Sequence, residues 1–148
     1  MRDWVRNGPI AEPRHARTIL PPLPTSAGAA RRFLRDRLND WGCPPALAED
    51  PCLLVSELVT NAIVHAGTSV GLELRVAGRR LRSSVSDESS RMPVARRGGP
   101  SRESGRGLQL VEELAADWGV ETTAAGKTVW FEVDLAARER RDRGRDRP

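Results

Sequence analysis

Hydrophobic and polar residues alternate along this chain with two periods, one typical of helices and one typical of strands. Apolar residues first recur at intervals of three and four positions at Ala30, Phe33, Leu34, Leu38 and Trp41. This spacing predicts an amphipathic helix that runs to about Trp41. Thr25 or Ser26 is a favoured N-cap for it, and Gly42 is a favoured residue to end it.

A second helix is predicted from near Asp50 to Ala66. An Asp at the N-cap accepts hydrogen bonds from the free amides of the first helical turn, and Pro51 is suited to the first helical position. Gly67 follows as a stop. A third helix is predicted to open at Gly107, with Leu108, Val111, Leu114 and Ala115 turned inward.

The remaining apolar positions alternate with polar ones, as in half-buried strands. The predicted strands are Ala16–Leu20, Val70–Val76, Leu81–Asp87, Val120–Thr123 and Lys127–Val133. Turn residues separate the second strand from the third, and the fourth from the fifth, so two antiparallel hairpins are expected. The order of elements predicts an α+β fold in which helices cover one face of an antiparallel sheet.

Composition narrows the class of protein. The chain has 148 residues, 39% of them hydrophobic, which suits one domain with a real core. No apolar run is long enough to span a membrane, and the N-terminus lacks the apolar middle of a signal peptide. A cytoplasmic protein without a membrane partner is therefore expected. Two cysteines without a Cys-x-x-Cys spacing argue against a zinc site or a disulfide framework.

The net charge of +4 lies mostly at the two ends of the chain. Residues 136–148 contain six arginines against three acidic residues and are expected to be a disordered tail. Residues 1–15 are expected to be flexible, which leaves residues 16–135 as a nearly neutral folded domain. A nucleic-acid-binding domain usually concentrates basic charge on its fold, so direct nucleic-acid binding is not expected.

The strongest candidate for chemistry lies on the second predicted helix. Glu57 and Asn61 are four residues apart, so they lie one turn apart on the same face. A carboxylate and an amide beside a core each need a polar partner. A divalent metal with a phosphate ligand would satisfy both.

Two further segments are weaker candidates. Asp87 ends a strand on the same side as Leu81 and Val85, and is either an ordinary turn residue or an acceptor for an exocyclic amine such as that of adenine. Gly105 and Gly107 precede a helix, where free amides favour an anion; the alternative is an ordinary loop-to-helix junction.

The polar stretch Ser89–Gly105 is long enough to be either a functional loop or disordered. Gly126-Lys127-Thr128 lacks the earlier glycine of a P-loop. Lys127 is therefore interpreted as a solvated residue of a turn.

The order of these signals is more specific than any one of them. The segments "SELVTNAIVHA", "ESGRGLQLVEELAADWGV" and "GKTVWFEV" resemble the GHKL ATPase superfamily, which includes histidine kinases and DNA gyrase. The nearer resemblance is to its anti-sigma-factor serine/threonine kinase branch, in the actinobacterial single-domain form. It covers about residues 16–135 and implies the Bergerat-type ATP-binding fold, a two-layer sandwich with a mixed, mainly antiparallel sheet.

The resemblance also implies roles for particular residues. Glu57 would be the general base, and Asn61 would coordinate the Mg²⁺ that bridges the phosphates of ATP. Asp87 would accept from the adenine amine, and Thr128 would assist adenine recognition. The segment 89–106 would be a lid. The helix start that would bind the nucleotide consists of Gly105, Arg106, Gly107 and Leu108.

The activity implied is Mg·ATP-dependent phosphorylation of a serine or threonine on an anti-anti-sigma protein of the STAS fold. A sigma factor would be a second partner, and a homodimer is expected. One departure leaves a rival open: the Asp-x-Gly-x-Gly box of the family reads Asp87-Glu88-Ser89-Ser90-Arg91 here, without its glycines. The rival is an ATP-binding or degenerate docking regulator without kinase activity.

Overall fold

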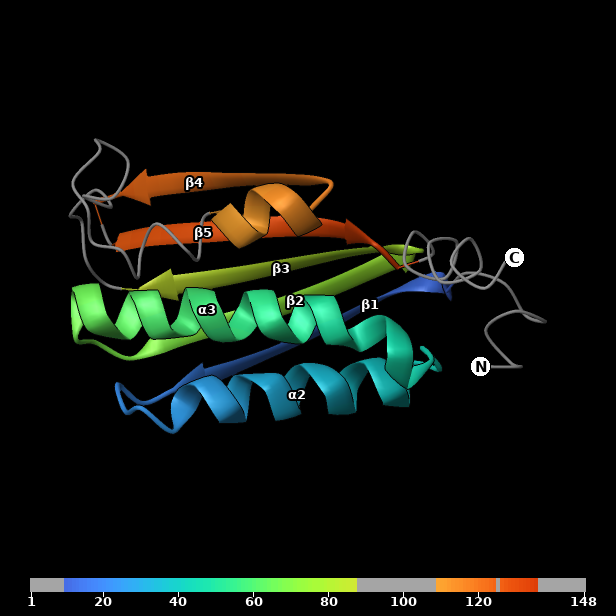
Figure 1. The fold of residues 1–148 in the computed structure, drawn as a ribbon, viewed down its shortest axis with the longest axis horizontal. Helices are drawn as coiled ribbons and strands as arrows, with labels where there is room; N and C mark the ends of the chain where they lie inside the picture. Colours follow the sequence, from blue (N-terminus) through green and yellow to red (C-terminus); the bar gives the residue numbers. More distant parts are fainter. Residues whose placement is uncertain (1–9, 88–108, 125, 136–148) are drawn as a thin grey trace, which may run out of the picture.

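The computed structural model describes residues 10–87, 109–124 and 126–135, and these residues form two layers (Figure 1). One layer is a sheet, and the other consists of helices that lie on one of its faces. Every strand pairing among the described residues is antiparallel. The predicted α+β sandwich, with helices on one face of a mainly antiparallel sheet, is confirmed.

The described strands form one five-stranded sheet in the order β1-β2-β3-β5-β4. Their bounds are β1 (Ile10–Leu20), β2 (Val70–Gly78), β3 (Arg80–Asp87), β4 (Asp117–Thr123) and β5 (Gly126–Asp134). Both predicted hairpins are present, and Gly78 has a φ of 61° at the turn between β2 and β3, a conformation that glycine adopts readily. Because β5 pairs with β3, the end of β3 lies beside the beginning of β5.

The helical elements with assigned bounds are α2 (Ser26–Asp40), the 3-10 helix η1 (Pro45–Ala48) and α3 (Glu49–Ala66). Residues 109–114 are also helical. They lie over β5, while α3 lies over the middle of the sheet, beside α2 (Figure 1). The start that was predicted for this third helix, at Gly107, falls outside the described residues.

The ends of the helices agree with prediction better than their beginnings. Gly67 ends α3 with a φ of 66°, and its N–H donates to the carbonyl of Ile63. Asp50, predicted as the N-cap of α3, lies in its first turn, because η1 leads directly into the helix. At the start of α2, Thr25 makes no capping hydrogen bond, and the Ser26 hydroxyl donates to the Pro21 carbonyl at 2.6 Å.

β1 begins at Ile10, earlier than the predicted Ala16. Residues 10–15, which were expected to be flexible, therefore lie in a strand. Pro13 is accommodated because β1 is an edge strand and its register with β2 shifts between Ile10 and Arg14.

The core lies between the helices and the inner face of the sheet. Alternate strand residues point inward and are fully buried, among them Leu72, Leu74, Leu81 and Phe131. Leu34 of α2 and Leu54, Val55 and Val59 of α3 are buried against them. Buried apolar area of this kind is the main favourable contribution to folding. The burial of these apolar side chains determines which strand residues face the helices and which face outward.

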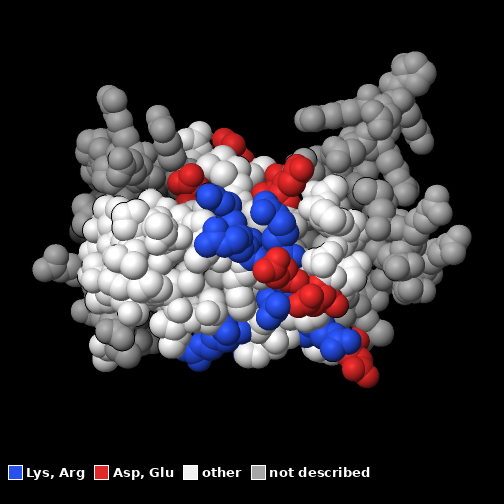
Figure 2. Space-filling model, turned by 90° about the horizontal axis from the view of Figure 1, so that it is seen from below, with Lys and Arg blue, Asp and Glu red and all other residues white. Residues whose placement is uncertain are grey.

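Charges of both signs share the outer surface. Figure 2 shows the molecule from below relative to Figure 1. On this face acidic side chains lie directly beside basic ones. In α2, Arg37 pairs with Asp40 at 2.8 Å. None of the helices in the described part of the chain is long and apolar enough to cross a membrane.

Candidate active site

Glu57 and Asn61 lie on one flank of α3, at the edge of its buried face. Both side chains are half-buried. Cys52 is two and a half turns before Asn61 and therefore on the opposite side of the helix. Its thiol contacts the carbonyl of Arg31 in α2 at 3.5 Å. Glu57 and Asn61 therefore face away from α2.

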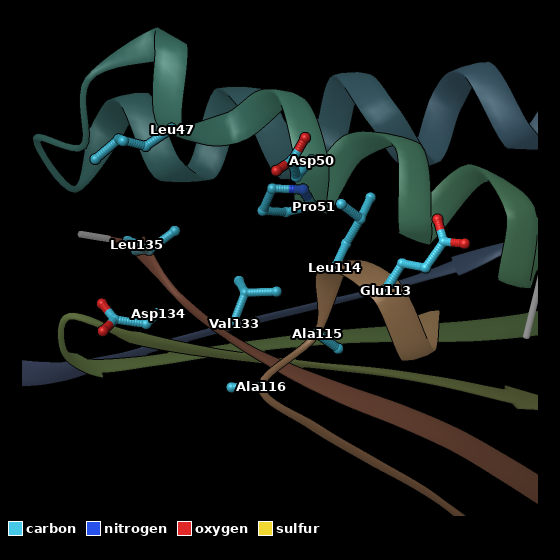
Figure 3. A pocket seen from close by; sticks show the side chains of 10 residues that line it. All are labelled: Leu47, Asp50, Pro51, Glu113, Leu114, Ala115, Ala116, Val133, Asp134 and Leu135. Carbon is cyan, nitrogen blue, oxygen red and sulfur yellow. The ribbon is translucent and has the colours of Figure 1, made fainter. Parts of the chain in front are cut away.

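The same flank faces the helical residues 109–114. Asp50 is about two turns before Glu57 on this side of α3. Figure 3 shows Asp50 and Pro51 across a cavity of about 120 Å³ from Glu113 and Leu114. Val133 of β5 and Leu135, which directly follows that strand, close the cavity below. Glu57 and Asn61 do not line this cavity; they lie farther along the same flank of α3, toward its C-terminal end.

Neither Glu57 nor Asn61 has a side-chain hydrogen bond or ion pair with another described residue. Half-buried polar groups are normally satisfied by protein, water or a ligand. A carboxylate and an amide oxygen are hard oxygen donors, the kind that Mg²⁺ prefers, and Mg²⁺ usually keeps several waters and substrate phosphates in its shell. The donor set therefore fits a Mg²⁺ ion held together with a nucleotide.

Asp87 lies at the end of β3 and faces the helices. Its alternating partners Leu81 and Val85 are in the core, and Asp87 itself is 6% exposed. Asp87 therefore shares a face with Leu81 and Val85, as the alternation predicted, and this face is the one that packs on the core. The end of β3, the start of β5 and the C-terminal end of α3 all lie at the same end of the sandwich (Figure 1).

Lys127 was interpreted from the sequence as a solvated turn residue, and that interpretation is wrong. It is 6% exposed, and its Nζ lies 3.4 Å from Oδ2 of Asp87. The two residues are directly opposite each other in the β3–β5 ladder. Lys127, Val129, Phe131 and Val133 alternate along one strand, so the sequence pattern already contained the signal. Its position beside a glycine turn hid that signal.

Thr128 points to the opposite face of the sheet. It pairs with Ser86 across the ladder, and the two hydroxyl oxygens are 2.8 Å apart. The structure therefore does not bring the Thr128 side chain together with Glu57, Asn61 or Asp87. The reason is the two-residue period of a strand, which separates Thr128 from its neighbour Lys127.

Gly105, Arg106, Gly107 and Leu108 lie outside the described residues, as does the segment 89–105. The described helix at 109–114 continues the chain directly after them. Their expected role in binding phosphates remains a prediction.

The outer face of the sheet has a different chemistry. Arg17, Arg75, Arg82, Ser86 and Thr128 are among the residues around a hollow of about 600 Å³ there. Most of these groups have partners within the face: Arg75 pairs with Glu73 at 2.8 Å, and Arg82 with Glu132 at 3.2 Å. The first pair lies within β2, and the second joins β3 to β5. Ion pairs of both kinds are common on a solvated sheet surface.

The two cysteines are not suited to chemistry. Burial raises the pKa of the Cys43 thiol to about 12, and burial also raises the pKa of Cys52. A thiol must ionise to act as a nucleophile or metal ligand. No three His, Cys, Asp or Glu side chains in the described ranges come together as a metal site would require.

The profile of the family described as "Histidine kinase-like ATPase domain" matches residues 20–133. The chain belongs to this family. Since the match spans the helix that carries Glu57 and Asn61 as well as the strand that ends at Asp87, all three lie within this ATPase domain. The resemblance drawn from the sequence is confirmed at this level.

Three solved structures are similar to this ATPase domain. The RsbU and RsbW domains of Rv1364c from Mycobacterium tuberculosis align with a TM-score of 0.63 and 21% identity over 81% of this chain. The blue-light activated histidine kinase EL346 of Erythrobacter litoralis aligns with a TM-score of 0.53 and 28% identity over 66%. A structure of the SiaB–SiaC complex from Pseudomonas aeruginosa aligns with a TM-score of 0.55 and 12% identity over 89%.

The lengths of these proteins differ. The chain spans 32% of the first structure, 33% of the second and 94% of the third. At the identities of the first and third, the likeness concerns the fold. A comparison with curated proteins found no match.

Proposed function

We propose that this protein is a Mg·ATP-dependent serine/threonine protein kinase that acts as an anti-sigma-factor-type regulator. One observation carries the proposal: within a histidine kinase-like ATPase domain, Glu57 and Asn61 lie one turn apart on a half-buried flank of α3 without other described protein partners. This combination supplies a base and a cation ligand at adjacent positions.

Glu57 is the general base. Its carboxylate accepts the proton of a serine or threonine hydroxyl as that oxygen attacks the γ-phosphorus of ATP. The new O–P bond forms as the bond from phosphorus to the ADP oxygen breaks, and ADP leaves. Phosphoryl transfer of this kind depends mainly on positioning and on stabilising charge.

Asn61 and Asp87 position the nucleotide. The Asn61 side-chain oxygen would hold Mg²⁺, which would neutralise charge on the phosphates. The Asp87 carboxylate accepts from the exocyclic amine of adenine. Asn61 is in the C-terminal part of α3 and Asp87 is the last residue of β3, and these ends of α3 and β3 lie at the same end of the sandwich (Figure 1). A nucleotide bound between the two residues would therefore have its base at the end of β3.

The protein substrate is an anti-anti-sigma protein of the STAS fold, and a sigma factor is the competing partner. The protein acts as a homodimer in the cytoplasm. Support for this assignment comes from the resemblance of the sequence to the anti-sigma-factor kinase branch. It also comes from the fold shared with RsbU and RsbW domains and with a structure of the SiaB–SiaC complex.

A second function is favoured by one feature of the sequence. Glu88-Ser89-Ser90-Arg91 replaces the glycines that follow the aspartate in the Asp-x-Gly-x-Gly box. Glycines allow close approach of the backbone to a ligand. Their loss favours a docking regulator that binds ATP weakly or not at all and transfers no phosphate.

The first test is calorimetric titration of ATP with Mg²⁺. We expect binding by the wild type, binding that weakens without Mg²⁺, and a loss of at least tenfold in Asn61→Ala. Thr60→Ala is the matched control, because Thr60 is the neighbouring residue and is exposed. No binding to the wild type would remove the ATP site and leave the docking function.

The second test is transfer of labelled γ-phosphate to STAS proteins encoded by the same genome. Glu57→Gln keeps the size of the side chain and removes the base, so transfer should be lost while ATP binding remains. Equal transfer by Glu57→Gln and wild type would exclude Glu57 as the base. ATP binding without transfer to any candidate would favour the docking regulator.

A further inference from the structure

The buried pair of Asp87 and Lys127 has a geometry that an ordinary structural ion pair does not require. The two side chains are 1% and 7% exposed, and the contact between them is 3.4 Å. Charge-assisted hydrogen bonds are usually 2.7–2.9 Å long. The pair is therefore loose, although burial of two charges favours close contact.

The ammonium group of Lys127 retains donor capacity. It has three N–H donors, and Asp87 is its one partner among the described residues. An ammonium that is almost completely buried loses its water and needs other acceptors in compensation. A ligand atom beside Asp87 that accepts a hydrogen bond would provide one.

The adenine edge has the complementary pattern. Its exocyclic amine is a donor, and the adjacent ring nitrogen N1 is an acceptor. Asp87 presents an acceptor and Lys127 presents a donor, side by side on the face of the sheet that the helices cover. Guanine has an acceptor at O6 and a donor at N1, which is the reverse order.

We propose that Lys127 is a base-reading residue that donates to N1 of adenine while Asp87 accepts from the exocyclic amine. This inference rests on the proposed ATP site. It assigns to Lys127 the recognition that the sequence resemblance assigned to Thr128, whose hydroxyl is on the other face of the sheet and bonded to Ser86. The pair then selects adenine over guanine by the order of donor and acceptor.

The test compares four nucleotides, ATP, two analogues of it and GTP, by titration in the presence of Mg²⁺. ATP has both the N1 acceptor and the exocyclic amine. 1-deaza-ATP lacks the N1 acceptor, and purine riboside triphosphate lacks the amine. The wild type should bind each analogue about tenfold or more weakly than ATP, because each analogue lacks one hydrogen bond to a buried charged group. GTP should bind more weakly than ATP by at least as much.

Variants identify Lys127 as the residue that senses N1. In Lys127→Met, ATP should bind about tenfold more weakly, and 1-deaza-ATP should bind as well as ATP. Ser86→Ala is the matched control, because Ser86 is next to Asp87 but faces outward, and it should keep the preference of the wild type for ATP. The double variant Asp87→Asn/Lys127→Met removes both charges, and it replaces Lys127→Met in the comparison of ATP with 1-deaza-ATP if the single variant does not fold.

Three results would overturn the inference. The wild type could bind 1-deaza-ATP as tightly as ATP, which needs no variant to observe. Lys127→Met, or the double variant in its place, could keep the discrimination between ATP and 1-deaza-ATP, which would leave Lys127 a structural partner of Asp87. The wild type could bind no ATP at all, and that result alone also removes the proposed function.

Discussion

Adjacent residues of β3 and β5 lie in two different environments. Asp87 and Lys127 face the helices and are buried, whereas Ser86 and Thr128, one position away in each strand, face outward. Both pairs are polar and both join the same two strands. On the covered face the pair carries buried charge that must be compensated, and on the outer face the pair is neutral and partly exposed.

The aromatic residues of β5 show the same contrast. Phe131 is completely buried against the helices. Trp130 lies on the outer face, where Arg82 stacks on its ring at 4.0 Å from the centroid. The comparison indicates that most of the stability comes from the inner face, which also carries the proposed ligand-binding pair Asp87 and Lys127. The outer face has interactions that are individually small.

Phe131→Ala should have the largest effect. Removal of a fully buried aromatic side chain leaves a cavity and should lower the free energy of unfolding by about 3–5 kcal/mol. Trp130→Ala, its outward-facing neighbour, should cost about 1–2 kcal/mol. Urea unfolding followed by circular dichroism measures both. Equal losses would mean that the two faces do not differ as described.

Lys127→Met should lower the free energy of unfolding by about 3 kcal/mol, because it removes one charge of a buried ion pair and leaves the other charge buried. Asp87→Asn/Lys127→Met should recover most of that loss. Thr128→Val, on the outer face, removes one hydrogen bond and should cost about 1 kcal/mol or less. A double variant as unstable as the single one would show that the charge pair is not the cause.

Gly119→Ala should disturb the outer face locally. A Cβ at this position would lie 2.7–2.8 Å from atoms of the Trp130 ring, so the ring must move and its stack with Arg82 is lost. We expect a cost of about 1–2 kcal/mol and a changed tryptophan fluorescence spectrum. In the Trp130→Ala background the same substitution should be nearly neutral, and a full cost there would contradict the explanation.

The smallest predicted effect is a dependence of the free energy of unfolding on pH, which comes from Glu73 on the outer face. Burial acts to raise the pKa of Glu73, but hydrogen bonds from Arg75 and His15 outweigh it and hold that pKa below its ordinary value of 4.5. Because the folded pKa is the lower one, the contribution to stability is full above pH 4.5 and is lost as the pH falls through the folded pKa.

We expect Glu73→Gln to be less stable than the wild type by less than about 1 kcal/mol at pH 7. The difference should vanish below the folded pKa. Urea unfolding of both proteins at pH 7 and at about pH 3 measures this change. A difference that stays constant with pH would assign the effect of the substitution to packing.

Periodicity in the sequence was sufficient to predict most elements. Helices at α2 and α3 and the two hairpins were recognisable because apolar residues recur at helical or strand intervals, with glycine at Gly42, Gly67 and Gly78 where they end. The start of β1 was not recognisable, since Pro13 is unusual in a strand. Only pairing along the sheet edge accommodates it.

The candidate site was only partly predictable. Glu57 and Asn61 follow from helical spacing alone, and Asp87 follows from the alternation of its strand. Lys127 was misinterpreted although it alternates with Val129 and Phe131, because a lysine after a glycine turn has the local pattern of a solvated residue. Its burial depends on the pairing of β5 with β3, a contact between segments far apart in the sequence.

The sequence by itself determined the elements, the family and the helix that carries Glu57 and Asn61, because these depend on local spacing and on short motifs. The tertiary structure decided which polar residues face the helices, and so brought Lys127 to Asp87 and placed Thr128 on the outer face. The physical reason is that strand residues alternate strictly between faces, and only packing of the helices on one face decides which residues are buried.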